Sequence, residues 1–154
     1  MKDHFKDFRF HVVIGPGFQD KEFFRNFCKE RKNVYYYEDP EDIYELMSKV
    51  DIAFSAGGGT LFELVYIGVP TIILPNSPEN LQLGNLLDNK GMALSISKIL
   101  DFRDNELLEK LQFLINNYEI RKNINERCRN KFHGEGQIKI ENIMIDFLKE
   151  HQKI

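Results

Sequence analysis

The residues best suited to chemistry lie in one short stretch, where a run of glycines opens a helical pattern. Three consecutive glycines follow an apolar segment: Gly57, Gly58 and Gly59. Backbone N–H groups at such a corner lie beside the positive end of a helix dipole, which suits an anion such as phosphate. Because glycine has no Cβ atom, a ligand can approach this backbone closely. The stretch therefore predicts an anion site.

The two polar residues after the glycines allow a second interpretation. Thr60 and Glu63 have the spacing of a capping box, in which Thr60 caps the helix and Glu63 bonds back to the cap N–H. That motif needs no ligand. In the alternative, the Glu63 carboxylate accepts hydrogen bonds from two adjacent hydroxyls, as on a ribose. Three glycines favour the ligand, since each destabilises the fold by roughly 0.5–1 kcal/mol relative to alanine.

A second group of polar residues follows the next apolar run. Glu79, Asn80 and Gln82 come shortly after a segment of isoleucines and leucine. Amide side chains there can donate hydrogen bonds to phosphate or sugar oxygens. Asn80 could instead cap a helix, which is a frequent role for asparagine. We predict all three as substrate-binding residues, with the cap as the alternative for Asn80.

Other chemistries find little support in the sequence. Gly15 and Gly17 begin a dinucleotide-like pattern, but Asp20 occupies the position of its third small residue, so NAD binding is not expected. There is no phosphate-binding Gly-Lys-Ser/Thr motif, and Ser55 lacks a nucleophile elbow. The four histidines show no metal-ligand spacing. We therefore predict no catalytic residue, no metal and no cofactor in this chain.

The composition indicates one ordinary globular domain over residues 1–154. A net charge of −3 gives no basic surface, which argues against nucleic acid as a partner. Cys28 and Cys128 are far apart and predict free thiols rather than a disulfide. The N-terminal residues lack a signal-peptide pattern, and no apolar run reaches the roughly 20 residues of a membrane span. A cytoplasmic protein is expected.

The order of elements indicates a parallel sheet. Five short apolar runs at 10–14, 34–37, 52–54, 71–74 and 93–96 alternate with helical patterns. This alternation predicts a Rossmann-like, doubly wound α/β fold with helices on both faces. Ligands bind such folds at the carboxyl ends of the strands, so Gly15, after the first run, joins the predicted substrate site.

After residue 104 the pattern is helical only, and the last helix shows an apolar stripe. Its members recur at helical spacing and predict a buried face: Ile140, Ile143, Met144, Phe147 and Leu148.

The glycine stretch also carries a family resemblance. Residues 51–63, together with Gly68 and Pro70, resemble the C-terminal donor-binding domain of GT-B glycosyltransferases. Within that group the pattern is most similar to the UDP-sugar hydrolases of pseudaminic acid and spore-coat polysaccharide synthesis, and next to MurG-type transferases. Residues 47–51 and the pair Glu79-Asn80 fit the hydrolase-like pattern. The turn at 132–136 resembles the one before the final helix in both groups. The resemblance covers about residues 10–148.

The resemblance implies a UDP-sugar as the ligand and assigns roles to the residues. The glycine loop and Thr60 would contact the diphosphate, and Glu63 would hold the ribose hydroxyls. Residues 37–42 would border the uracil, while Asn80 and Gln82 would reach the diphosphate or the sugar. In the hydrolases an asparagine and a glutamine are adjacent, whereas Leu81 separates them here.

A larger departure from the family lies at the start of the chain. The family's C-terminal domain begins with a strand and a glycine-rich loop that this sequence lacks. Its N-terminal acceptor domain, which supplies the general base, is also not in this sequence. We therefore expect a fragment or partial subunit that binds a UDP-sugar and cannot catalyse alone. The alternative is a non-catalytic interaction subunit that completes a site with a separate acceptor-domain chain.

Overall fold

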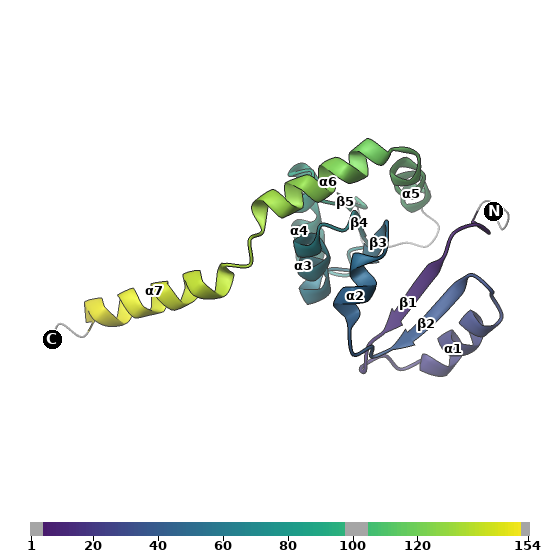
Figure 1. Ribbon diagram of the computed structural model, residues 1–154, viewed down its shortest axis with the longest axis horizontal. Helices are drawn as coiled ribbons and strands as arrows, with labels where there is room; N and C mark the ends of the chain where they lie inside the picture. Colours follow the sequence, from purple (N-terminus) through teal and green to yellow (C-terminus); the bar gives the residue numbers. More distant parts are fainter. Residues whose placement is uncertain (1–4, 98–104, 152–154) are drawn as a thin grey trace. The chain divides into compact units, whose positions relative to one another are not determined.

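A computed structural model describes residues 5–97 and 105–151 of the chain (Figure 1). The chain divides into two compact units, Met1–Ile43 and Tyr44–Ile154, and each is described by itself. Residue 104, where the predicted helical region begins, lies outside the described residues.

The first unit is a two-stranded parallel sheet with one helix against it. Strand β1 (Phe10–Ile14) pairs with β2 (Val34–Glu38), so that Phe10 lies opposite Val34 and Ile14 opposite Glu38. Helix α1 (Lys21–Lys29) packs against β2 and buries Cys28.

Aromatic side chains gather on the strands of this first unit. The ring of His11 stacks on Tyr35, with centroids 5.2 Å apart, and its Nδ1 lies 3.0 Å from the Tyr37 hydroxyl. These three residues share one face of the sheet because side chains alternate along a strand.

The second unit contains a three-stranded parallel sheet in the order β3-β4-β5. Its strands are β3 (Ala53–Ser55), β4 (Thr71–Ile73) and β5 (Leu94–Ser95). Its helices are α2 (Ile43–Ser48), α3 (Gly58–Ile67), α4 (Pro78–Asn89), α5 (Glu106–Asn116), α6 (Tyr118–Lys131) and α7 (Gly136–His151). None of the described helices is long and apolar enough to cross a membrane.

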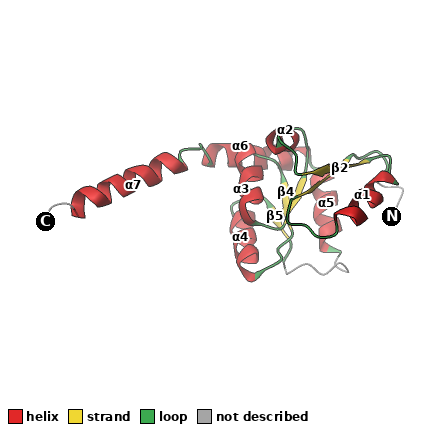
Figure 2. Ribbon diagram, turned by 90° about the horizontal axis from the view of Figure 1, so that it is seen from below, coloured by secondary structure: helices red, strands yellow, loops and turns green. Residues whose placement is uncertain are grey.

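Helices cover both faces of this second sheet, and the hydrophobic core lies where they pack against it. Figure 2 shows β4 and β5 between α3 and α4 on one side and α5 on the other. Ile72 and Ile73 of β4 are fully buried, as are Leu61 of α3 and Leu114 of α5. All three residues of β4 are buried, as in a parallel sheet covered on both faces, and the hydroxyl of its one polar residue, Thr71, donates a hydrogen bond to the Val69 carbonyl at 2.8 Å.

Both cysteines are free, as predicted, and the structure places both in buried positions. The Cys128 thiol donates a hydrogen bond to the Met92 carbonyl, with a sulfur–oxygen distance of 3.3 Å. Burial raises the pKa of this thiol to about 11. Cys128 is therefore a packing residue of the core, because the unreactive thiol form dominates at neutral pH.

The predicted Rossmann-like parallel α/β class is confirmed, but the five strands form two sheets rather than one. The observed orders are β1-β2 in the first unit and β3-β4-β5 in the second.

The predicted buried face of the last helix is wrong. All sixteen residues of α7 are exposed, including the apolar stripe, whose exposed fractions run from 53% at Leu148 to 68% at Ile143. An amphipathic helix buries its stripe only when another element covers it, and no described part of the chain buries this one.

Candidate functional site

The chain enters helix α3 through glycines, which contribute only backbone atoms to the N-terminus of the helix. Ser55 at the end of β3 is buried, and the chain enters the helix through Gly57, its N-cap residue. Gly57 and Gly58 have φ angles of +138° and +70°, values that side-chain-bearing residues rarely adopt. No side chain in the described part of the chain caps this helix. Its first four N–H groups, which lack partners inside the helix, therefore have no side-chain acceptor.

The capping-box interpretation is wrong. Thr60 is the third residue of α3, and an N-cap must lie outside the helix. The glycines start the helix three residues earlier than that motif requires, so the Thr60 side chain is not at the cap position. Glu63 has a different partner as well. It accepts a hydrogen bond from the Tyr44 hydroxyl at 3.0 Å, and this bond raises the pKa of Tyr44.

Helix α4 begins beside the glycine corner but is capped in the ordinary way. Ser77 is its N-cap and accepts a hydrogen bond from the Asn80 backbone N–H at 3.3 Å, while Pro78 is the first helical residue. The predicted capping role of Asn80 is therefore wrong. A serine directly before a proline at the first helical position is the sequence signal that could have identified this cap.

The Asn80 side chain lies against the glycine corner. A Cβ atom built on Gly57 would be 2.4 Å from Asn80 Oδ1, which is too close for any real side chain. One N–H of the Asn80 amide donates to Asn76 Oδ1 at 2.6 Å, which orients the group. The structure thus brings Asn80 and the glycine loop together, as predicted for the carboxyl ends of neighbouring strands.

Glu79 and Gln82 do not join this arrangement. The backbone N–H of Glu79 and the Ser77 hydroxyl donate hydrogen bonds that lower the pKa of the Glu79 carboxyl. The negative charge of Glu79 therefore interacts favourably with the positive end of the α4 helix dipole. Gln82 follows Asn80 by two residues, which rotates it by about 200° around the helix. It is exposed and lies on a different face of α4 from Asn80.

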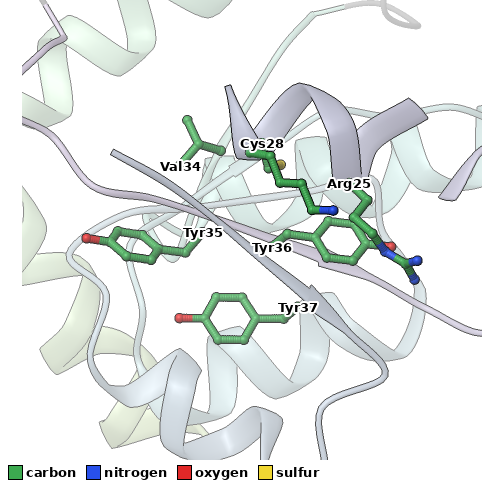
Figure 3. A pocket seen from close by; sticks show the side chains of 7 residues that line it. Arg25, Cys28, Val34, Tyr35, Tyr36 and Tyr37 are labelled. Carbon is green, nitrogen blue, oxygen red and sulfur yellow. The ribbon is translucent and has the colours of Figure 1, made fainter. Parts of the chain in front are cut away.

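The first unit contains Gly15 and a separate pocket. Gly15 lies in the exposed turn after β1, and a Cβ atom there would meet nothing within 4 Å. A pocket of about 440 Å³ is lined by residues of α1 and β2, and Figure 3 shows their side chains. Of the residues expected to contact the substrate, only Tyr37, from the predicted uracil-bordering segment 37–42, lines it. Its walls are Arg25, Cys28, Lys29, Val34, Tyr35, Tyr36 and Tyr37.

Glu38 forms ion pairs with two basic side chains near this pocket. Arg25 and Lys21 both bind the Glu38 carboxylate, and their hydrogen bonds lower its pKa. The Arg25 guanidinium also lies 5.8 Å from the centre of the Tyr36 ring. These contacts hold α1 on β2 and explain the polar lining without a ligand.

The arrangement around α3 can hold an anion and accept hydroxyl groups. The N–H groups of residues 57–60 provide the donors, and the Glu63 carboxylate provides the acceptors. Across residues 5–97 and 105–151, no cluster of three or more His, Cys, Asp or Glu side chains could hold a metal ion.

Comparison with known proteins gives matches over most of the chain. A family model described as the glycosyltransferase family 28 C-terminal domain matches residues 2–131. The spore coat polysaccharide biosynthesis protein SpsG of Bacillus subtilis (strain 168) is 24% identical over 145 residues, covering 94% of this chain and 43% of that protein. The uncharacterized protein MJ1062 of Methanocaldococcus jannaschii is 31% identical over 72 residues, covering 45% of this chain and 15% of that protein.

Solved structures with a similar fold include MurG and WaaG. MurG of Acinetobacter baumannii superposes with a TM-score of 0.65 at 18% identity, covering 90% of this chain and 42% of that one. WaaG, a glycosyltransferase involved in lipopolysaccharide biosynthesis, gives 0.61 at 19% identity, covering 79% and 33%. The chain thus spans less than half the length of each of these proteins and of SpsG.

The glycine corner predicts opposite effects for two neighbouring alanine substitutions. Gly57→Ala forces a side chain into a conformation that only glycine tolerates and against Asn80, so the free energy of unfolding should fall by about 2 kcal/mol. Gly59→Ala adds a Cβ atom into open space within a helix, so stability should be unchanged or rise by up to about 1 kcal/mol. Urea unfolding followed by circular dichroism measures both. Equal losses in the two variants would contradict this geometry.

Proposed function

Because the chain belongs to the family of glycosyltransferase family 28 C-terminal domains, we propose that it binds the UDP-sugar donor of a nucleotide-sugar hydrolase or glycosyltransferase. The observation that carries the proposal is the uncapped N-terminus of α3. A diphosphate binds well where a glycine loop leads from the buried end of a strand into a helix whose first N–H groups are exposed.

In this proposal the diphosphate lies over Gly58 and Gly59. Both glycines face open space, since a Cβ atom at either one would meet nothing within 4 Å. A phosphate oxygen can therefore approach the N–H groups without meeting a side chain. The fully buried Leu61 fixes the helix that carries these groups, so the donors are oriented before the ligand arrives.

Two side chains extend the proposed site beyond the diphosphate. The Glu63 carboxylate lies one turn further along α3 and can accept both hydroxyls of a ribose. The Asn80 amide has a second N–H besides the one bound to Asn76, and this group can donate to a phosphate or sugar oxygen. Gly15 and residues 37–42, in the first unit, remain proposed contacts to the substrate and the uracil.

The reaction of the whole protein follows from the same ligand. The bond between the anomeric carbon and the diphosphate oxygen would break, with the nucleoside diphosphate leaving and water or a sugar hydroxyl attacking. Helix-terminal N–H groups stabilise the charge that develops on the leaving diphosphate. We propose that an acceptor domain outside this sequence binds the attacking water or sugar and supplies the general base.

The proposal predicts that uridine nucleotides raise the thermal stability of the chain. At about 100 times its Kd, UDP or a UDP-N-acetyl sugar should add roughly 2.7 kcal/mol to the free energy of unfolding, whereas NAD should add nothing. Glu63→Gln should weaken UDP binding about tenfold, because it removes a charged acceptor. Glu126→Gln, the same charge change on the exposed face of α6, should leave binding unchanged. No shift with any uridine nucleotide at millimolar concentration would refute the proposal.

The second candidate function is an interaction subunit, and specific observations favour it. Strand β1 and strand β3 each lie at an edge of their own sheet, and an edge strand is a template for pairing with another chain. Helix α7 also presents exposed apolar side chains. In this case the chain would bind UDP only after assembly with a separate acceptor-domain chain.

Size-exclusion chromatography with light scattering separates the two candidates. A chain that is an interaction subunit should elute with a candidate acceptor-domain chain as one complex, and its affinity for UDP should appear only in that complex. Unchanged elution of both chains, with full UDP binding by this chain alone, would eliminate the second candidate.

A further inference from the structure

We infer that Tyr44 is a positioning residue that holds the Glu63 carboxylate in place for the two hydroxyls of the ligand's ribose. The inference rests on the proposed function and adds a residue that neither the sequence motif nor the family match assigns. Its basis is the hydrogen bond from the Tyr44 hydroxyl to Glu63 Oε1, which joins two residues 19 positions apart at 3.0 Å.

Both partners stand on elements that the core holds in place. Met47, one turn after Tyr44, is buried and anchors α2. Leu61 and Leu64 flank Glu63 in sequence and anchor α3. Glu63 itself is half-buried, so the backbone positions of the donor and the acceptor are both set by packing. The hydrogen bond then removes the remaining freedom of the carboxylate.

Tyr44 contributes little to the packing of the hydrophobic core. Its side chain is 53% exposed, so the ring contributes little to packing. An exposed hydrogen bond likewise adds little to stability. The contact therefore matters mainly for the direction in which the carboxylate points.

The carboxylate keeps enough capacity for a diol. Its two oxygens offer about four lone-pair sites, and Tyr44 occupies one of them at Oε1. One ribose hydroxyl can donate to Oε2, and the other can donate to Oε1 or to the lone pair of the Tyr44 oxygen. The bond to Glu63 also raises the pKa of Tyr44, which keeps the phenol protonated as a donor.

The experiment compares UDP with 2′-deoxy-UDP by isothermal titration calorimetry on the full chain. The wild-type chain should prefer UDP. Tyr44→Phe removes only the hydroxyl and should weaken UDP binding by about five- to tenfold, since one hydrogen bond to a charged group is lost. Binding of 2′-deoxy-UDP, which keeps only the 3′ hydroxyl as a donor to Glu63, should weaken less, so the preference should shrink. Tyr118→Phe, which removes the hydroxyl of another exposed tyrosine in the same unit, should behave as wild type.

A double-mutant cycle distinguishes positioning of the Glu63 carboxylate from a general structural role of Tyr44. In the Glu63→Gln background, Tyr44→Phe should cause no further loss of UDP affinity, because the carboxylate that it positions is gone. Additive losses would overturn the inference. So would equal weakening of both nucleotides by Tyr44→Phe, or no weakening of either. Those results leave the proposed function intact, whereas a wild-type chain that binds neither nucleotide refutes the proposed function and the inference together.

Discussion

The N-terminus of α3 is the feature on which the rest of the site depends. The chain leaves the buried end of β3 and enters this helix through two glycines with positive φ angles, and no side chain among the described residues caps the exposed N–H groups. The neighbouring helix α4 starts at the same edge of the sheet with Ser77 as its cap. In a capped helix a side chain accepts a hydrogen bond from the N-terminal N–H groups, whereas in α3 these N–H groups are available to a ligand.

The packing of the second unit fixes those donors in space. Leu61, Leu64 and Val65 bury one side of α3, and Gly68 ends the helix with a left-handed φ of +87°. The Asn125 amide donates to the Gly68 carbonyl at 2.8 Å, which ties the C-terminal end of α3 to α6. Because packing already orients the amides of α3, anion binding costs little further conformational entropy.

Local features could be predicted from the sequence, and features that depend on tertiary partners could not. Strand β1 has the predicted bounds, and the glycine corner opens a helix as expected. The capping box failed because the spacing of Thr60 and Glu63 fits the motif while the glycines start the helix earlier. The buried face of α7 failed because periodicity shows which residues are apolar and not whether anything covers them. The bond between Tyr44 and Glu63 depends on how α2 meets α3, and no sequence spacing reveals that.

The most direct test of the account is an NMR titration that follows the backbone amide signals of the chain. If the uncapped helix holds a diphosphate, UDP should shift the signals of Gly58, Gly59 and Thr60 more than any others in α3, and uridine without phosphates should leave them in place. If UDP shifts signals elsewhere in the second unit while these three amides stay unchanged, the glycine corner is not the diphosphate site.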